Sequence, residues 1–197
     1  MMKKIKLKEM KLPTTSQLEK ELVRVKYKYK YMKILKSTIY TLIVVIALSI
    51  LASTFLFSVL EIYGNSMSPN INEGDVVVGI NDSELETGDV IAFYYNNRIL
   101  VKRVVAVSSQ WVDIDAEGNV FVDGKLIEEP YIDNKFYGEV DIEFPYQVPE
   151  NSYFVLGDKR NLSIDSRNSL IGTISKNEII GKVIFRVWPI KNFGTID

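Results

Sequence analysis

The longest uncharged run of the chain extends from Ser37 to Leu60, and most of its 24 residues are apolar. About 20 such residues cross the hydrocarbon core of a bilayer as a helix. A buried core helix would share the pattern, but the length favours a membrane span. A cleaved signal peptide would have an apolar region of only about 7–15 residues. We therefore predict an uncleaved transmembrane signal anchor over residues 37–60.

Charge differs on the two sides of this run. Residues 1–36 contain 12 Lys and Arg against 3 Asp and Glu, a net charge of +9, whereas the rest of the chain carries −10. Lys and Arg beside a membrane span stay in the cytoplasm. The charge pattern thus predicts a basic cytoplasmic head over residues 1–36 and an extracytoplasmic part over residues 61–197.

The basic head has two conflicting patterns. Ser16 followed by Glu19 fits a helix capping box, and five apolar residues recur at alternating spacings of four and three. These are Leu18, Leu22, Val25, Tyr29 and Met32. Residues 23–31 also alternate apolar with basic side chains, as a strand would. A lysine-rich helix on anionic lipid is the favoured interpretation, and a solvated tail is the alternative.

Beyond the anchor, the polar and apolar positions predict a mainly β domain. Asn96-Asn97 and Asp123-Gly124 are typical of hairpin turns between strands. Residues 108–150 are rich in Asp, Glu, Tyr and Pro and predict a small excursion from the main antiparallel sheet. The expected strands are Val76–Val78, Val90–Tyr95, Arg98–Val107, Val120–Val122, Lys125–Ile127, Tyr153–Leu156 and Gly181–Val187.

The composition narrows the possible chemistry. The chain contains neither His nor Cys. A Ser-His-Asp triad, a Cys-His dyad, a disulfide framework and a zinc site built on His or Cys are therefore excluded. If the protein is a hydrolase, a group other than imidazole must move the proton.

Two segments contain residues that could supply such chemistry. Ser66 lies in a turn between Gly64 and Pro69, although most serines in such loops only hydrogen-bond the backbone. Lys102 lies in a strand and shares a face with apolar side chains. Burial there would lower the pKa of its amine and make it a possible general base. The alternative is a strand lysine whose amine reaches water.

A third segment, residues 157–167, reads Gly-Asp-Lys-Arg-Asn-Leu-Ser-Ile-Asp-Ser-Arg. This density of Gly, Asp, Asn and Ser is typical of an ordered loop with many local hydrogen bonds. By itself it would be interpreted as a surface loop or an Asp-rich cation site. The three interleaved basic residues argue against a cation.

Together, the three segments resemble type I signal peptidases. The family's nucleophile pattern is Gly-x-Ser-Met-x-Pro-Thr, and residues 64–69 match it, with Asn70 in place of Thr. The family's lysine lies in a Lys-Arg-Val-Val strand, as in residues 102–105. Its third pattern, Gly-Asp-Asn-Arg-x-x-Ser-x-Asp-Ser-Arg, matches residues 157–167 except at Lys159. The resemblance spans residues 37–190 and implies a signal-peptidase-like antiparallel sheet.

The resemblance also implies roles for individual residues. Ser66 corresponds to the nucleophile, Lys102 to the general base and Ser163 to the hydroxyl that orients the lysine amine. Some relatives have a serine at the position of Gly64 that donates to the oxyanion, so backbone N–H groups would serve here. The expected supporting residues are Met67 and Gly157 within the motifs, with the ion pairs Arg103–Asp158 and Asp165–Arg167.

The function implied by the resemblance is removal of signal peptides from exported preproteins, with small residues preferred before the cut. No metal or organic cofactor is expected, and the partners are preproteins and the lipid bilayer. A specialised factor for assembly of surface proteins or pilins is the alternative. The self-cleaving SOS repressors share the Ser-Lys arrangement but lack a membrane span. A non-enzymatic anchored domain would not explain the three motifs. Signal peptidases of the endoplasmic-reticulum kind use His as the base, and this chain has no His.

Overall fold

A computed structural model describes residues 13–81 and 83–196 of the chain. The chain divides into two units, residues 1–51 and 52–197. The first twelve residues of the predicted basic head lie outside the described residues.

One long helix, α1 (Thr15–Leu56), forms the described part of the first unit and continues into the second. It is long and apolar enough to cross a membrane, and none of its residues is buried by the rest of the protein. The described part of the head is therefore helical, and the strand-like alternation of residues 23–31 is not realised. The helix begins earlier than Ser16 and Glu19 suggested, because the Thr14 amide donates to Gln17 Oε1 at 3.0 Å.

The helix ends four residues before the end of the uncharged run. Residues 57–60 lie instead in β1 (Phe57–Glu61), which pairs with β2 (Val76–Ile80). In β1, Phe57, Val59 and Glu61 are exposed and Ser58 and Leu60 are half-buried, the alternation expected of an edge strand. Strand pairing thus competes successfully with continuation of the helix at this point.

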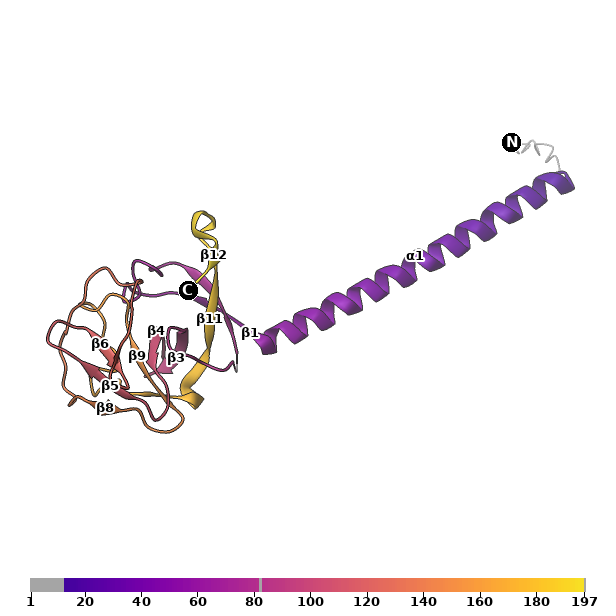
Figure 1. Ribbon diagram of the computed structural model, residues 1–197. Coiled ribbons are helices and arrows are strands. Elements are labelled where there is room, and N and C mark those ends of the chain that lie inside the picture. Colours follow the sequence, from indigo (N-terminus) through magenta and orange to yellow (C-terminus); the bar gives the residue numbers. More distant parts are fainter. Residues whose placement is uncertain (1–12, 82, 197) are drawn as a thin grey trace, which may run out of the picture. The chain divides into compact units, whose positions relative to one another are not determined.

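The second unit contains an eight-stranded sheet in which every pair is antiparallel (Figure 1). Its order is β1-β2-β11-β3-β4-β9-β10, with β12 paired to β11. The bounds of the other strands are β3 (Val90–Tyr95), β4 (Arg98–Ala106), β9 (Ser152–Leu156), β10 (Ile174–Ser175), β11 (Ile179–Trp188) and β12 (Gly194–Thr195). The model therefore confirms a mainly antiparallel β fold behind one apolar helix.

Residues 108–150 contain a second, smaller sheet of order β7-β6-β5-β8. Its apolar face packs on Val105, Ala106 and Phe154 of the main sheet. The four strands are β5 (Trp111–Ile114), β6 (Val120–Val122), β7 (Lys125–Leu126) and β8 (Tyr146–Gln147). Two short 3₁₀ helices, η1 (Lys176–Glu178) and η2 (Ile190–Asn192), flank β11.

Both predicted hairpin turns are present. Asn96 and Asn97 join β3 to β4 with φ of 43° and 63°, and Asp123 and Gly124 join β6 to β7 with φ of 50° and 75°. Positive φ at both central residues is the conformation that matches the twist of paired strands. The tight β3–β4 turn fixes the register in which Ile91 lies opposite Lys102.

The core lies on both faces of the central strands. Every residue from Val101 to Ala106 in β4 is buried, so Lys102 and Arg103 are buried on opposite faces of one strand. Met67, with 2% of its surface exposed, packs in a cluster with Ile62 and Ile71. The buried Met67 side chain thus holds the segment that carries Ser66 against the sheet.

Candidate active site

The structure brings Ser66 and Lys102 together from segments 36 residues apart. Lys102 Nζ lies 2.6 Å from Ser66 Oγ. Ser66 lies in the turn that follows β1, and Lys102 lies in the middle of β4. The contact joins the hydroxyl and the amine that the motifs indicated as nucleophile and base. Its length is that of a strong hydrogen bond.

Lys102 is 3% exposed, and this burial lowers the pKa of its amine from 10.5 to about 8. The cause is the loss of hydration around the charged form. The carboxylates of Asp165 and Asp158 oppose the shift, and the Arg167 guanidinium adds to it. A substantial fraction of the amine is therefore neutral near pH 8, as a general base requires.

Gly157 and Lys159 of the third motif lie directly against the Ser66 backbone. The Lys159 amide donates to Ser66 O at 3.0 Å. A Cβ atom at position 157 would lie 2.7 Å from that same oxygen and 2.2 Å from Ser163 Oγ, distances that are too short for any side chain. Gly157 is thus required by close approach, because only glycine lets the loop reach the serine.

Ser163 lies against Gly157, but its hydroxyl makes no hydrogen bond to any part of the chain that the structure describes. The contact with the Lys102 amine that the resemblance implied is therefore absent from this structure. The amine of Lys102 is instead held by Ser66 Oγ. The orienting role of Ser163 stays a prediction.

The Ser66 amide donates to no acceptor among residues 13–81 and 83–196. It is therefore available to an oxyanion formed at the serine. Gly64, at the place where some relatives have a serine, has a φ of 85° and open space around its Cα. Donation to an oxyanion by the backbone at this place stays a prediction.

Arg103 and Asp158 form one of the two expected ion pairs. Arg103 Nε and Nη2 each lie 2.9 Å from an oxygen of Asp158, and both side chains are buried. Asn70 Nδ2 donates to Asp158 Oδ2 at 2.8 Å and also to Tyr131 O. The Tyr131 ring in turn lies 4.0 Å from the Arg103 guanidinium. Asn70, which departs from the family pattern, is therefore part of the hydrogen bonding around this pair.

The second expected pair, Asp165–Arg167, is also formed and buried. Arg167 Nε lies 2.8 Å from Asp165 Oδ1, and the other oxygen of Asp165 accepts from the Gly157 amide at 3.0 Å. Arg167 Nη1 donates to the carbonyls of Phe136 and Tyr137. The pair therefore fixes the third motif internally and ties it to the excursion.

Sequence reasoning missed a third buried pair, between Arg160 of the third motif and Glu129 of the excursion. Arg160 belongs to the motif, but its partner lies 31 residues earlier in a segment without a recognisable pattern. A buried arginine nearly always needs a carboxylate. That requirement indicates that a partner exists but does not identify Glu129 among the 22 acidic residues beyond the head.

An open groove of about 760 Å³ runs past the two reactive groups. Ser66 and Lys102 lie on its wall, and most of its other side chains are apolar. These include Tyr63, Leu100, Leu162, Ile164, Leu170 and Ile171. A groove with a nucleophile, a base and apolar walls can bind an extended apolar peptide and cleave it by acyl transfer.

Comparison with known proteins places the chain in a family. Residues 35–188 match the family model described as signal peptidase, peptidase S26. Signal peptidase IB of Staphylococcus aureus (strain COL) is 35% identical over 159 residues, which cover 71% of this chain and 82% of that protein. Signal peptidase I of Bacillus caldolyticus is 32% identical over 157 residues, 71% of this chain and 84% of that protein.

Among solved structures, a signal peptidase I from Enterococcus faecalis V583 is similar, with a TM-score of 0.44 and 25% sequence identity. The match covers 51% of this chain and 97% of that one. The family model spans most of the chain, and both relatives are more than 30% identical to it. The chain therefore belongs to the signal peptidase family, peptidase S26, as a serine endopeptidase of the signal peptidase I kind.

Proposed function

We propose that this chain removes signal peptides from exported preproteins with Ser66 as nucleophile and Lys102 as general base. The observation that carries the proposal is the 2.6 Å contact between Ser66 Oγ and Lys102 Nζ at the wall of the groove. An unprotonated amine at that distance can accept the hydroxyl proton as the oxygen attacks a peptide carbonyl.

Each later step uses a group near this contact. The Ser66 amide stabilises the oxyanion of the tetrahedral intermediate. Lys102, now protonated, gives its proton to the leaving amine as the peptide bond breaks and the acyl-enzyme forms. Lys102 then takes a proton from the water that attacks the ester, and returns it to Ser66. Ser163 orients the Lys102 amine during these transfers, and the two ion pairs hold the loop in place.

The organisation of the chain supports access to preproteins. Residues 37–56, the uncharged part of α1, act as a transmembrane anchor, the basic head over residues 1–36 stays in the cytoplasm, and residues 57–197, which begin with β1, form the extracytoplasmic catalytic domain. The apolar run, the Lys and Arg excess before it and the family support this arrangement. Small residues at the first and third positions before the cut are preferred, as the family resemblance implies.

The test is cleavage of a model preprotein by the full chain in detergent, with Ser66→Ala and Lys102→Ala as variants. Wild type should cut after a small residue, and each substitution should lower kcat by about 10⁴-fold or more. Tryptophan fluorescence should show the same fold in all three proteins. Equal cleavage by wild type and Lys102→Ala would overturn the assignment of the base.

A further inference from the structure

Two hollows lie along the segment that carries Ser66. The first is the apolar groove, whose wall includes Gly64, Asn65 and Ser66. The second is a pocket of about 530 Å³ whose wall includes Ser68. Two residues of extended chain span at most about 7 Å. Because Ser68 lies two residues from Ser66, the second pocket begins within about 7 Å of Ser66 along the same segment, within reach of the residues next to the bond that is cut.

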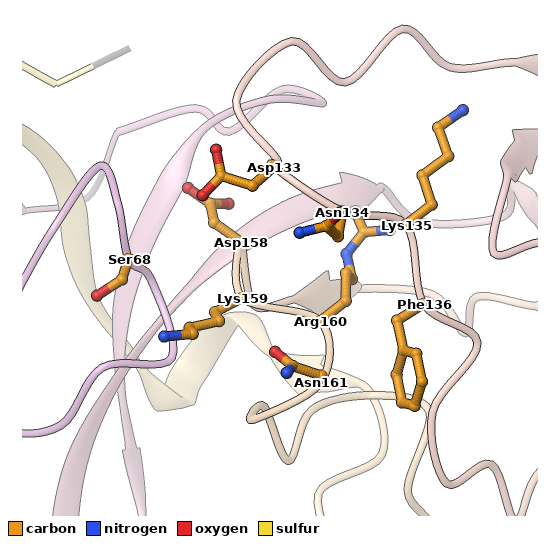
Figure 2. A pocket seen from close by; sticks show the side chains of 9 residues that line it. All are labelled: Ser68, Asp133, Asn134, Lys135, Phe136, Asp158, Lys159, Arg160 and Asn161. Carbon is orange, nitrogen blue, oxygen red and sulfur yellow. The ribbon is translucent and has the colours of Figure 1, made fainter.

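The second pocket is polar where the groove is apolar. Its walls are residues 158–161 of the third motif and residues 133–136 of the excursion, which Figure 2 shows facing one another. A signal peptide is apolar ahead of its cut site, whereas the mature protein that follows is polar. The chemistry of the two hollows thus assigns the groove to the signal peptide and the polar pocket to the start of the mature protein.

Most charged groups in this pocket are already engaged. Asp158 is paired with Arg103, Arg160 is paired with Glu129, and Lys135 Nζ donates to Asn119 Oδ1 at 2.5 Å. Among the described residues, the side chains of Lys159 and Asp133 have no hydrogen-bond or ion-pair partner. The pocket therefore offers a peptide one ammonium and one carboxylate without a partner among the described residues, while Lys135 keeps its charge but is directed toward Asn119.

Of these two, Lys159 lies closer to the cut. Its amide is bonded to Ser66 O, and its side chain extends toward the segment of Ser68 (Figure 2). Asp133 lies on the opposite wall, and Lys135 extends away from Lys159. The first charge that a mature protein meets beyond Ser66 is thus the ammonium of Lys159, which replaces the Asn of the family pattern.

We infer that Lys159 is a specificity residue that favours preproteins with an acidic side chain at the first or second position after the cut. This inference rests on the proposed function, because it takes the bond at Ser66 as the one that is cleaved. Exposed ion pairs stabilise by up to about 1 kcal/mol, so the preference for Glu over Gln should be about two- to fivefold. Asp133 opposes it from the opposite wall.

The experiment compares peptides that differ only at these two positions, with Glu, Gln or Lys there, as substrates of the full chain in detergent. The ratio of kcat/KM for Glu to that for Gln should be about three in wild type. It should fall to one or below in Lys159→Gln, where Asp133 remains, reverse in Lys159→Glu, and rise in Asp133→Asn. Lys135→Gln, in the same pocket, should keep the wild-type ratio, and 1 M salt should remove the preference.

Binding of the same fluorescent peptides to the Ser66→Ala variant separates this inference from the proposed function. Suppose that peptide affinity depends on charge, that this dependence is lost in the Lys159 variants, and that the wild-type chain does not cleave. This result would support the role of Lys159 in the pocket and overturn the peptidase mechanism. Cleavage with equal rates for Glu, Gln and Lys peptides would overturn the role of Lys159 alone. A Glu preference that survives Lys159→Glu would overturn it as well.

Discussion

At the scale of single residues, the site depends on a lysine that the strand β4 removes from water. Lys102 has apolar neighbours along β4 and is 3% exposed. Burial is the largest cause of the shift and lowers the pKa of its amine to about 8. The carboxylates of Asp165 and Asp158 act in the opposite direction, and the Arg167 guanidinium, which is paired with Asp165, adds to the lowering.

This titration predicts how the rate depends on pH. Because only the unprotonated Lys102 accepts the Ser66 proton, kcat/KM should rise with pH and level off above the pKa of about 8. The neutral fraction increases from about a tenth one pH unit below the pKa to about nine tenths one unit above it. A peptide without titratable side chains measures this profile directly. A rate that stays constant from pH 6 to 10 would contradict it.

The buried pair Arg103–Asp158 predicts a large loss of stability when one partner is removed. Asp158→Ala leaves the Arg103 guanidinium buried without a counter-ion and should lower the free energy of unfolding by about 3–5 kcal/mol. Chemical unfolding followed by Trp fluorescence measures the loss. The control is Lys182→Met, which breaks the ion pair between Lys182 and Asp89. The side chains of that pair are 33% and 15% exposed, respectively. The effect of Lys182→Met should stay below about 1 kcal/mol, and similar losses in both variants would contradict the argument.

At the scale of elements, the third motif is a loop that depends on contacts in three directions. It bonds Ser66 O through Lys159, it holds Asp165 under the Gly157 amide, and it reaches the excursion through Arg160 and Arg167. Apart from the Gly157–Asp165 bond, these contacts are made to residues outside the loop, so the loop is fully ordered only when the main sheet and the excursion are both folded. Ser66 and the loop that supports it are consequently one cooperative structure.

Gly157 tests this dependence. A methyl group at position 157 would meet Ser66 O at 2.7 Å and Ser163 at 2.5 Å or less, so Gly157→Ala must move the loop or the serine. We expect kcat to fall by at least about tenfold, with a stability loss of about 1–3 kcal/mol. Gly79→Ala in β2 is the control, since its new Cβ would lie 3.2 Å from Lys182 O, away from the site. Full activity in Gly157→Ala would show that the loop accommodates the methyl group.

The strands differ in how far the sequence predicts them. β3 matches its predicted bounds, and β4 ends one residue earlier than expected, because each has apolar runs bounded by turn residues. The two-residue strands β8 and β10 have no periodicity of their own and exist through pairing with β5 and β9. The end of α1 could not be predicted either, since residues 57–60 are as apolar as the helix before them.

The site shows the same division. The motifs single out Ser66 and Lys102 as the candidate nucleophile and base because their spacing is characteristic, and the strand pattern places Lys102 among apolar neighbours. The partners from the excursion, Glu129 and Tyr131, depend on how two sheets pack against each other. Asn70 looked like a departure at the edge of the site, and only its contacts show it bonded to Asp158.

At the scale of the whole molecule, the helix α1 is longer than a membrane requires. Its 42 residues extend about 63 Å at 1.5 Å per residue, against a hydrocarbon thickness of about 30 Å. The uncharged part accounts for roughly half of that length. The remaining half, from Thr15 to Lys36, carries all seven Lys and Arg residues of the helix, and such charges are costly inside the hydrocarbon core.

The absence of Cys from the chain allows a direct test of its orientation. The proposed topology places Lys20 in the cytoplasm and Glu117, an exposed residue near the second sheet, outside. A membrane-impermeant maleimide should therefore label a Glu117→Cys variant on intact cells, and label a Lys20→Cys variant only after permeabilisation. Both variants should still cleave a preprotein in detergent, because neither residue touches the site. Labelling in the reverse order would place the catalytic domain in the cytoplasm, away from the exported part of a preprotein, and would overturn the proposed function along with the topology.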